Sequence, residues 1–173
     1  MDCDFFCDCA EFRRYSVHLP YPEVTITQPN KRYASIISGA YAGKGSESTA
    51  IAQYSVHRFF TQRYPDIFIA YKDIAFTEMI HFTLLGNLIG GLGLKPELIS
   101  YETGQYWNGS FPARRSSIKE TLDADIQGEK DAVAHYKRMI GRIDNNSIQK
   151  LFERIIMDEE MHIQILTELY GSL

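Results

Sequence analysis

The sequence predicts an all-α protein, a four-helix bundle with one long crossover connection. Four long segments carry apolar residues at the spacing of an amphipathic helix, and Gly, Pro or Asn residues separate them. Two segments contain Glu-x-x-His and two contain Glu-x-x-Ala-x-x-x-Tyr, and the two motifs alternate along the chain. Because the Glu residues of each pair lie at nearly equal spacing, the pattern indicates an internal duplication of a helix pair.

The composition is typical of one globular domain and excludes several classes of function. The chain has 173 residues, of which 45% are apolar and 23% charged. Its 18 Lys and Arg and 22 Asp and Glu give a net charge of −4 without a basic cluster, which argues against nucleic-acid binding. The longest apolar run, residues 79–94, is too short and too often interrupted to span a membrane. No signal peptide is visible. We therefore expect a cytoplasmic protein.

Residues 1–28 show no helical periodicity and are expected to form a tail and an arm ahead of a helical domain at residues 29–173. The three cysteines, Cys3, Cys7 and Cys9, lie among acidic residues, and no fourth cysteine completes a tetrathiolate site. A reduced tail and a redox, metal-capturing or cross-linking role are both open for them. The Pro-rich piece through Thr27 is expected to pack as an arm on the outside of the domain or on a partner subunit.

The first half of the domain is expected to contain three helices. Gly43-Lys44-Gly45 separates the first helix from the second, and Pro65 separates the second from the third. Ser46 has the side chain of a helix N-cap and would begin the second helix. His57 in that helix is interpreted either as a core-edge or surface histidine or as a support for a nearby site. The expected helices are residues 29–41, 46–64 and about 66–91.

Residues 92–116 form a connection long enough to cross the bundle from end to end, a distance of ~30 Å for a helix of twenty residues. Its aromatic residues, among them Tyr106 and Trp107, are expected to pin it to the bundle. Two helices would follow, one at residues 117–140 and one after a short turn at Asp144-Asn145-Asn146. Two short links and one long crossover describe a ferritin-like four-helix bundle with a short additional helix at its N-terminal end.

Charged side chains interrupt the apolar stripes at matched positions of the four long helices. Glu159 and His162 fall where the last stripe predicts apolar residues, and residues three apart on a helix are surface neighbours. Because burying an unpaired charge is costly, something must neutralise this pair, and a metal ion is one candidate. The duplicated motifs give six candidate metal ligands: Glu47, Glu78, His81, Glu129, Glu159 and His162.

The ligand types favour particular ions. Four carboxylates balance the charge of two divalent cations, whereas without metal some of these carboxylates must be protonated. One imidazole per ion together with shared carboxylates is an oxygen-rich set that suits two iron or two manganese ions. These ligands do not saturate two six-coordinate ions, so positions remain for peroxide, dioxygen or water.

Further side chains are expected to hold the ligands in place. Tyr54 and Tyr136 lie on the same helix faces as Glu47 and Glu129, and each could hydrogen-bond a carboxylate of a neighbouring helix or simply pack in the core. Asp158 is placed to orient the imidazole on the facing helix, His81. The counterpart of Asp158 in the other repeat is Thr77, which we expect to be a weaker orienting group.

These motifs resemble the ferritin-like superfamily of dinuclear metal carboxylate proteins. Residues 117–166 are similar to rubrerythrins and bacterioferritins, and Pro29-Asn30-x-Arg32-x-Ala34 through Glu47-x-x-Ala50-x-x-x-Tyr54 is similar to the short, spore-coat type of manganese catalase. The resemblance implies the same six ligands named above and allows a spore-associated location. Rubrerythrins usually carry a second Glu where this chain has Ala132, and a Cys-x-x-Cys rubredoxin module that this sequence lacks.

Three functions are open at this stage. The first is an oxidoreductase acting on hydrogen peroxide, of the manganese-catalase or rubrerythrin type. The second is a ferroxidase or iron-handling protein that uses dioxygen or peroxide, and the third is a structural, coat-type metal-binding protein. We expect a homo-oligomer, a dimer or larger, with peroxide or dioxygen as substrate, no nucleic-acid or membrane partner, and an external electron donor if the protein is a peroxidase.

Overall fold

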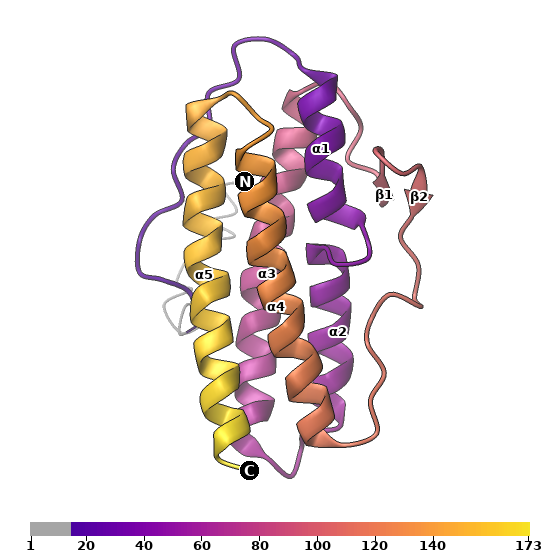
Figure 1. Cartoon of the computed structure of the whole chain (residues 1–173), viewed down its shortest axis with the longest axis vertical. Coiled ribbons are helices and arrows are strands. Elements are labelled where there is room, and N and C mark those ends of the chain that lie inside the picture. Colours follow the sequence, from indigo (N-terminus) through magenta and orange to yellow (C-terminus); the bar gives the residue numbers. More distant parts are fainter. Residues whose placement is uncertain (1–14) are drawn as a thin grey trace, which may run out of the picture.

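The computed structural model describes residues 15–173, and four of its helices lie side by side in a bundle (Figure 1). The predictions for Cys3, Cys7 and Cys9 fall outside the described residues. The shorter α1 lies above α2 in Figure 1, and both helices contact α3. The helices are α1 (Lys31–Ala42), α2 (Glu47–Phe59), α3 (Pro65–Gly91), α4 (Ile118–Ile140) and α5 (Asn146–Gly171). No helix within residues 15–173 is long and apolar enough to cross a membrane.

Side-chain caps explain where most of these helices begin. Ser46 accepts a hydrogen bond from the Thr49 N–H at the start of α2, as the sequence predicts. Ser117 and Glu120 form a reciprocal capping box at the start of α4, and the Asn145 side chain caps α5. The starts of α2, α4 and α5 are therefore fixed locally, which helps to set the register of the motifs on these helices.

The largest difference between the expected and the observed helix boundaries is at the end of α2. We expected α2 to run to Tyr64, but it ends at Phe59. The Thr61 hydroxyl donates to the Arg58 carbonyl at 2.9 Å and satisfies one of the helix's last acceptors. Pro65 then occupies the first turn of α3, where its missing N–H costs nothing, and it disfavours helical geometry at Tyr64 before it.

The crossover contains a small hairpin that the sequence pattern did not reveal. Strands β1 (Ile99–Ser100) and β2 (Gln105–Tyr106) pair antiparallel, and Gly104 adopts a positive φ of 69° in the turn between them. Trp107 donates from its indole nitrogen to the Thr49 hydroxyl of α2 at 3.0 Å, so this aromatic residue does pin the crossover. Tyr106 does not, since 64% of it is exposed.

The core is divided into two apolar clusters. One lies between α1 and the neighbouring halves of α3, α4 and α5, and the other includes Tyr54, Tyr71 and Leu166 at the opposite end. The Glu and His motifs lie between these clusters, at the middle of α3, α4 and α5. Apolar packing on both sides therefore holds the four helices at the level of the charged residues.

The N-terminal arm, residues 15–28, runs along the outside of this chain's own bundle beside α5 (Figure 1). Arg154 of α5 donates to the carbonyl oxygens of Val17 and Leu19 at 2.5–3.0 Å. The arm thus packs on the outside of the domain, which is one of the two placements that the sequence left open.

A buried polar clamp joins the crossover to α2 and α4. The His57 imidazole lies 3.0 Å from an Asp125 carboxylate oxygen and 2.9 Å from the carbonyl oxygen of Ala113. The Gln53 side chain donates to Asp125 at 2.6 Å and accepts from the Ala113 N–H at 2.6 Å. His57 is therefore neither a surface residue nor in contact with the six candidate ligands. Its role is to fasten residues 92–116 to the bundle.

We predict that Asp125→Asn destabilises the protein by roughly 1–3 kcal/mol, because it leaves buried donors of His57 and Gln53 facing an amide. Burial lowers the pKa of His57, but the hydrogen bond to Asp125 outweighs it and raises the pKa. Because the pKa of His57 is higher in the folded than in the unfolded protein, protonation of His57 stabilises the fold. This stabilisation is complete below the pKa of about 6.5 of an unfolded histidine and is lost as pH rises through the pKa of the folded protein.

The loss should consequently be larger at pH 6 than at pH 8, as measured by urea unfolding at both pH values. Asp123→Asn, on the exposed face of the same helix, is the matched control and should change the free energy of unfolding little at either pH. An equal loss for Asp125→Asn at both pH values would show that the clamp does not hold a protonated imidazole.

Candidate metal centre

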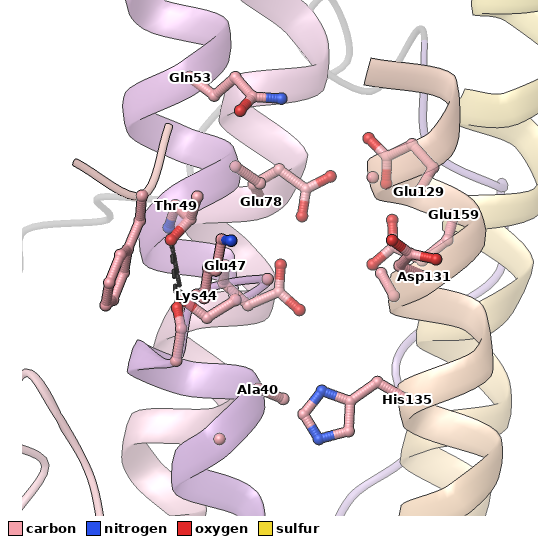
Figure 2. Close-up of a pocket in the computed structure, with 18 of the residues that line it drawn as sticks. Ala40, Lys44, Glu47, Thr49, Gln53, Glu78, Glu129, Asp131, His135 and Glu159 are labelled. Atoms are coloured by element: carbon pink, nitrogen blue, oxygen red, sulfur yellow. Dashed lines mark hydrogen bonds between the residues drawn. The ribbon is translucent and has the colours of Figure 1, made fainter. Parts of the chain in front are cut away.

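The six candidate ligands of the sequence analysis lie together at the centre of the bundle. Glu47 and Glu129, which begin the two Glu-x-x-Ala-x-x-x-Tyr motifs, lie on α2 and α4. The two Glu-x-x-His motifs lie on α3 and α5. All six are buried, with exposed fractions of at most 4%. Figure 2 shows Glu47 and Glu78 pointing from one side toward Glu129 and Glu159 on the other.

The donor atoms form two overlapping groups. In each group, one atom from each residue lies within 4.8 Å of the others. The carboxylates of Glu78 and Glu159 belong to both groups, as expected for residues that bridge two ions. The groups are Glu47, Glu78, His81 and Glu159, and Glu78, Glu129, Glu159 and His162. These groups could bind two metal ions.

Both imidazoles turn the same nitrogen toward the centre. Nδ1 of His162 lies 3.0 Å from Glu78 and 3.1 Å from Glu159. Nδ1 of His81 lies 3.2 Å from Glu78 and 3.3 Å from Glu159. Nδ1 is therefore the ligand atom offered on each histidine, and Nε2 faces outward.

Without a cation, protons must balance the charges of this centre. Burial and the neighbouring carboxylates raise the pKa of Glu47 and Glu129 well above the usual range. Burial lowers the pKa of His81 and His162, but the surrounding carboxylates outweigh it and raise the pKa of both well above the usual value. Burial also opposes the ionisation of Glu78, yet the two imidazoles hold its pKa well below the usual value.

The inward atoms of the centre carry charges that only contacts within the centre balance, and their chemistry fits metal ions. Among residues 15–173, Oε1 of Glu78, both carboxylate oxygens of Glu159 and Nδ1 of His162 are buried and make no hydrogen bond, although they lie within ion-pair distance of one another or of His81. Buried polar atoms that make no hydrogen bond are costly and rare unless a ligand satisfies them. Carboxylate oxygens with one imidazole per position suit hard divalent ions such as iron or manganese.

The two tyrosines hydrogen-bond carboxylates across the bundle. The Tyr54 hydroxyl of α2 donates to Glu129 of α4, and the Tyr136 hydroxyl of α4 donates to Glu47 of α2. Both tyrosines are also packed in the apolar clusters. Each therefore does both things that the sequence analysis left open: it hydrogen-bonds a carboxylate of another helix and packs in the core. The exchange is symmetric, as expected of a duplicated helix pair.

The outward nitrogens of the histidines have different partners. Oδ2 of Asp158 lies 3.1 Å from Nε2 of His81, which is the contact expected from the sequence. Burial opposes the ionisation of Asp158, but contacts with His81 and Arg154 lower its pKa well below the usual range. Nε2 of His162 instead lies 2.9 Å from the backbone carbonyl oxygen of Tyr15 in the arm.

The expectation for Thr77 is therefore wrong. Its hydroxyl faces the Asp73 carbonyl of its own helix, at 3.4 Å, and reaches neither imidazole. A helical threonine readily hydrogen-bonds the carbonyl one turn before it. The group that faces Nε2 of His162 in place of Thr77 is the main-chain carbonyl of Tyr15, and a backbone group has no signature in the sequence.

A cavity of about 770 Å³ leads to the carboxylates from the side of α2 and α4. All four candidate Glu ligands line it, together with Tyr54 and Tyr136. Gly128 and Ala132 leave space on α4, and His135 points into the cavity from that helix (Figure 2). Small molecules from solvent can thus approach the centre, a feature that the helical pattern alone did not reveal.

Solved structures share this fold. A manganese catalase from Anabaena superposes with a TM-score of 0.82 at 22% identity, covering 90% of this chain and 78% of that one. A bacterioferritin from Rhodobacter capsulatus, described as having a metal-free dinuclear site and haem iron, gives a TM-score of 0.67 at 24% identity, covering 82% and 85% of the two chains. These matches confirm the predicted ferritin-like bundle.

Two sequence comparisons show which family of ferritin-like proteins the chain belongs to. A bacterioferritin from Brucella melitensis is 38% identical over 53 residues, a stretch that covers 29% of this chain and 33% of that protein. The match thus spans only about a third of the curated relative. The family model of rubrerythrin matches residues 40–170, which contain all six candidate ligands. The chain therefore belongs to the rubrerythrin family of ferritin-like proteins.

Proposed function

We propose that this chain binds two iron or manganese ions at the candidate metal centre and acts on hydrogen peroxide. The observation that carries the proposal is a set of four buried carboxylates and two imidazoles, in two overlapping groups, at the end of a cavity. A pair of such ions supplies a two-electron redox couple. A manganese-loaded protein is expected to be a catalase.

The chain's own residues hold the donor atoms in place for this task. Glu78 and Glu159 are the shared carboxylates, while Glu47 and Glu129 each serve one position and are fixed by a tyrosine hydroxyl. Asp158 accepts a hydrogen bond from the Nε2–H of His81, which leaves Nδ1 free to donate its lone pair inward. The apolar clusters on both sides exclude water except through the cavity.

Disproportionation of peroxide is favoured because it needs no electron donor. Two hydrogen peroxide molecules give two waters and one dioxygen, so the electrons taken by one peroxide come from the other. The sequence offers no Cys-x-x-Cys iron site through which a donor-dependent reductase would receive electrons. The fold shared with a manganese catalase supports this choice.

Ferroxidase activity is the second candidate. It is favoured by the 38% identical segment of a bacterioferritin and by the buried carboxylate oxygens that make no hydrogen bond, which suit iron(II) as substrate. In that case the bound iron itself supplies the electrons. Association into a homo-oligomer stays a prediction for either activity and is tested by sedimentation.

We predict that Glu159→Gln reduces bound manganese or iron well below two ions per chain. Glu159 belongs to both donor groups, so the change removes a charged ligand from each position. Metal content is measured by mass spectrometry on protein from metal-supplemented cells. The control is Glu160→Gln, one residue away on the exposed face of α5, which should keep full occupancy. Full occupancy in Glu159→Gln would refute the assignment of the centre.

Metal removal should lower the melting temperature. An ion that binds only the folded state stabilises it by about 2.7 kcal/mol at a hundredfold excess over its Kd, which corresponds to about 5–10 °C for a chain of this size. Calorimetry with and without a chelator measures the difference. If the metal-free and metal-loaded forms melt together, the ions are not bound at the buried carboxylates.

Oxygen release distinguishes the candidate activities. Manganese-loaded protein should release about one dioxygen per two peroxides without any added reductant, as measured with an oxygen electrode. Iron-loaded protein without a donor should be oxidised once and stop. Peroxide consumption that requires an added rubredoxin-like donor, with no oxygen released, would exclude the catalase activity.

A further inference from the structure

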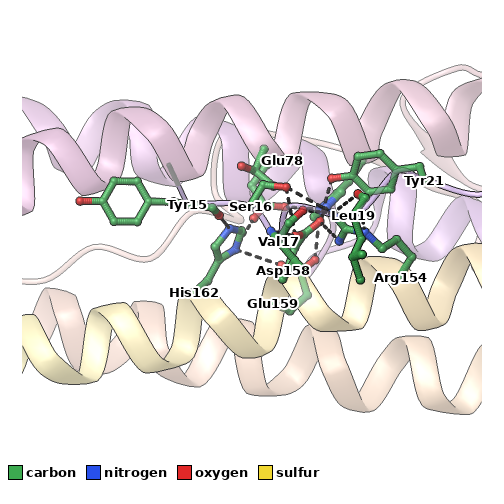
Figure 3. Close-up of polar contacts among 12 residues, drawn as sticks. Tyr15, Ser16, Val17, Leu19, Tyr21, Glu78, Arg154, Asp158, Glu159 and His162 are labelled. Atoms are coloured by element: carbon green, nitrogen blue, oxygen red, sulfur yellow. Dashed lines mark hydrogen bonds and ion pairs between the residues drawn. The ribbon is translucent and has the colours of Figure 1, made fainter. Parts of the chain in front are cut away.

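The first residues of the arm contact both candidate histidine ligands from outside the bundle. The carbonyl oxygen of Tyr15 accepts from Nε2 of His162 at 2.9 Å. The ring of Tyr21 stands edge-on to the His81 imidazole, with centroids 5.9 Å apart. Figure 3 shows the arm crossing α5 at the level of His162 and Asp158.

Three hydrogen bonds of the arm converge on Asp158, the residue that orients His81. Ser16 and Tyr21 donate from their hydroxyls at 3.1 and 2.7 Å, and the backbone N–H of Val17 donates at 2.7 Å. Asp158 is fully buried, although it lies beneath a segment with no regular secondary structure. Three of the donors that satisfy this carboxylate thus come from residues 16–21.

Arg154 ties the same stretch of the arm to α5. Its guanidinium donates to the carbonyls of Val17 and Leu19, lies 4.5 Å above the Tyr21 ring, and forms an ion pair with Asp158 at 2.7 Å. Because one side chain binds both the arm and Asp158, the arm cannot leave without loss of buried hydrogen bonds at Asp158.

We propose that residues 15–21 retain the metal ions by holding the outward sides of both histidine ligands. This inference rests on the metal centre of the proposed function and adds positioning residues to it. With the arm docked, both Nε2 protons have an acceptor, and Nδ1 of each imidazole is held toward the carboxylates. When the arm leaves, His162 loses its acceptor and Asp158 loses three donors. The bound ions are then released faster.

Thermodynamic reciprocity supplies a test that does not depend on activity. If docking of the arm strengthens metal binding, metal binding must strengthen docking by the same factor. Amide hydrogen exchange of residues 15–21 is therefore measured by mass spectrometry with and without bound manganese. Manganese should slow exchange at the Val17 amide, which donates to Asp158, by at least about tenfold, in line with losses typical of groups that support a ligand.

Two substitutions test the arm without touching a ligand. Tyr21→Phe removes one donor to Asp158, and Arg154→Lys keeps the charge but cannot hold both arm carbonyls. Each should speed manganese release to a chelator by about 10–100-fold and alter the Mn(II) electron paramagnetic resonance spectrum. Tyr101→Phe, which removes a hydroxyl bonded to Lys95 in the crossover, is the matched control and should change neither.

The outcomes separate this inference from the proposed function. A wild-type protein that binds no manganese overturns both. Bound manganese without oxygen release overturns the catalase proposal and leaves the arm's role standing. Bound manganese with unchanged exchange at Val17, or with release rates in both variants equal to those of Tyr101→Phe, overturns the role of the arm.

Discussion

The concentration of charge at the centre of the bundle is the constraint on which the rest of the structure depends. Four carboxylates and two imidazoles lie where a helical bundle would otherwise bury apolar side chains. In a medium of low dielectric constant, like charges this close repel strongly, so protons or cations must balance them. A fold that keeps these groups apart from bulk water therefore gains from binding ions and must be rigid enough to present them together.

The bundle meets this requirement by surrounding the charges with apolar packing and cross-helix hydrogen bonds. The two apolar clusters lie on either side of the centre, so no helix can shift there without disturbing one of them. Tyr54 and Tyr136 join α2 to α4 through the carboxylates of Glu129 and Glu47. These bonds are important because α2 and α4 face each other across the cavity rather than through close packing. These two carboxylates, which line the cavity, thus also join the helices on either side of it.

The sequence predicted the contacts of side chains on the inward faces of helices, but not the contacts made by backbone groups and irregular segments. Glu-x-x-His twice, on clear apolar stripes, was sufficient to predict the bundle and the convergence of six donor residues, because helical periodicity places them on inward faces. The position of Asp158 followed from the same geometry. Thr77 was misjudged because a helical hydroxyl bonds its own backbone. The Tyr15 carbonyl and the hairpin at Ile99–Tyr106 arise from tertiary contacts of irregular segments, and backbone groups leave no mark in a residue pattern.

The two halves of the duplicated site are unequal because their histidines have different outward partners. His81 faces an ionised carboxylate, whereas His162 faces a neutral carbonyl, although their inward contacts with Glu78 and Glu159 are nearly the same. A carboxylate partner makes an imidazole a stronger electron donor than a carbonyl does. The ion beside His81 is consequently expected to bind more tightly and to be oxidised more readily than its neighbour. Duplication gave this chain a symmetric set of candidate ligands, whereas Asp158 of α5 and the Tyr15 carbonyl of the arm give the two histidines different environments.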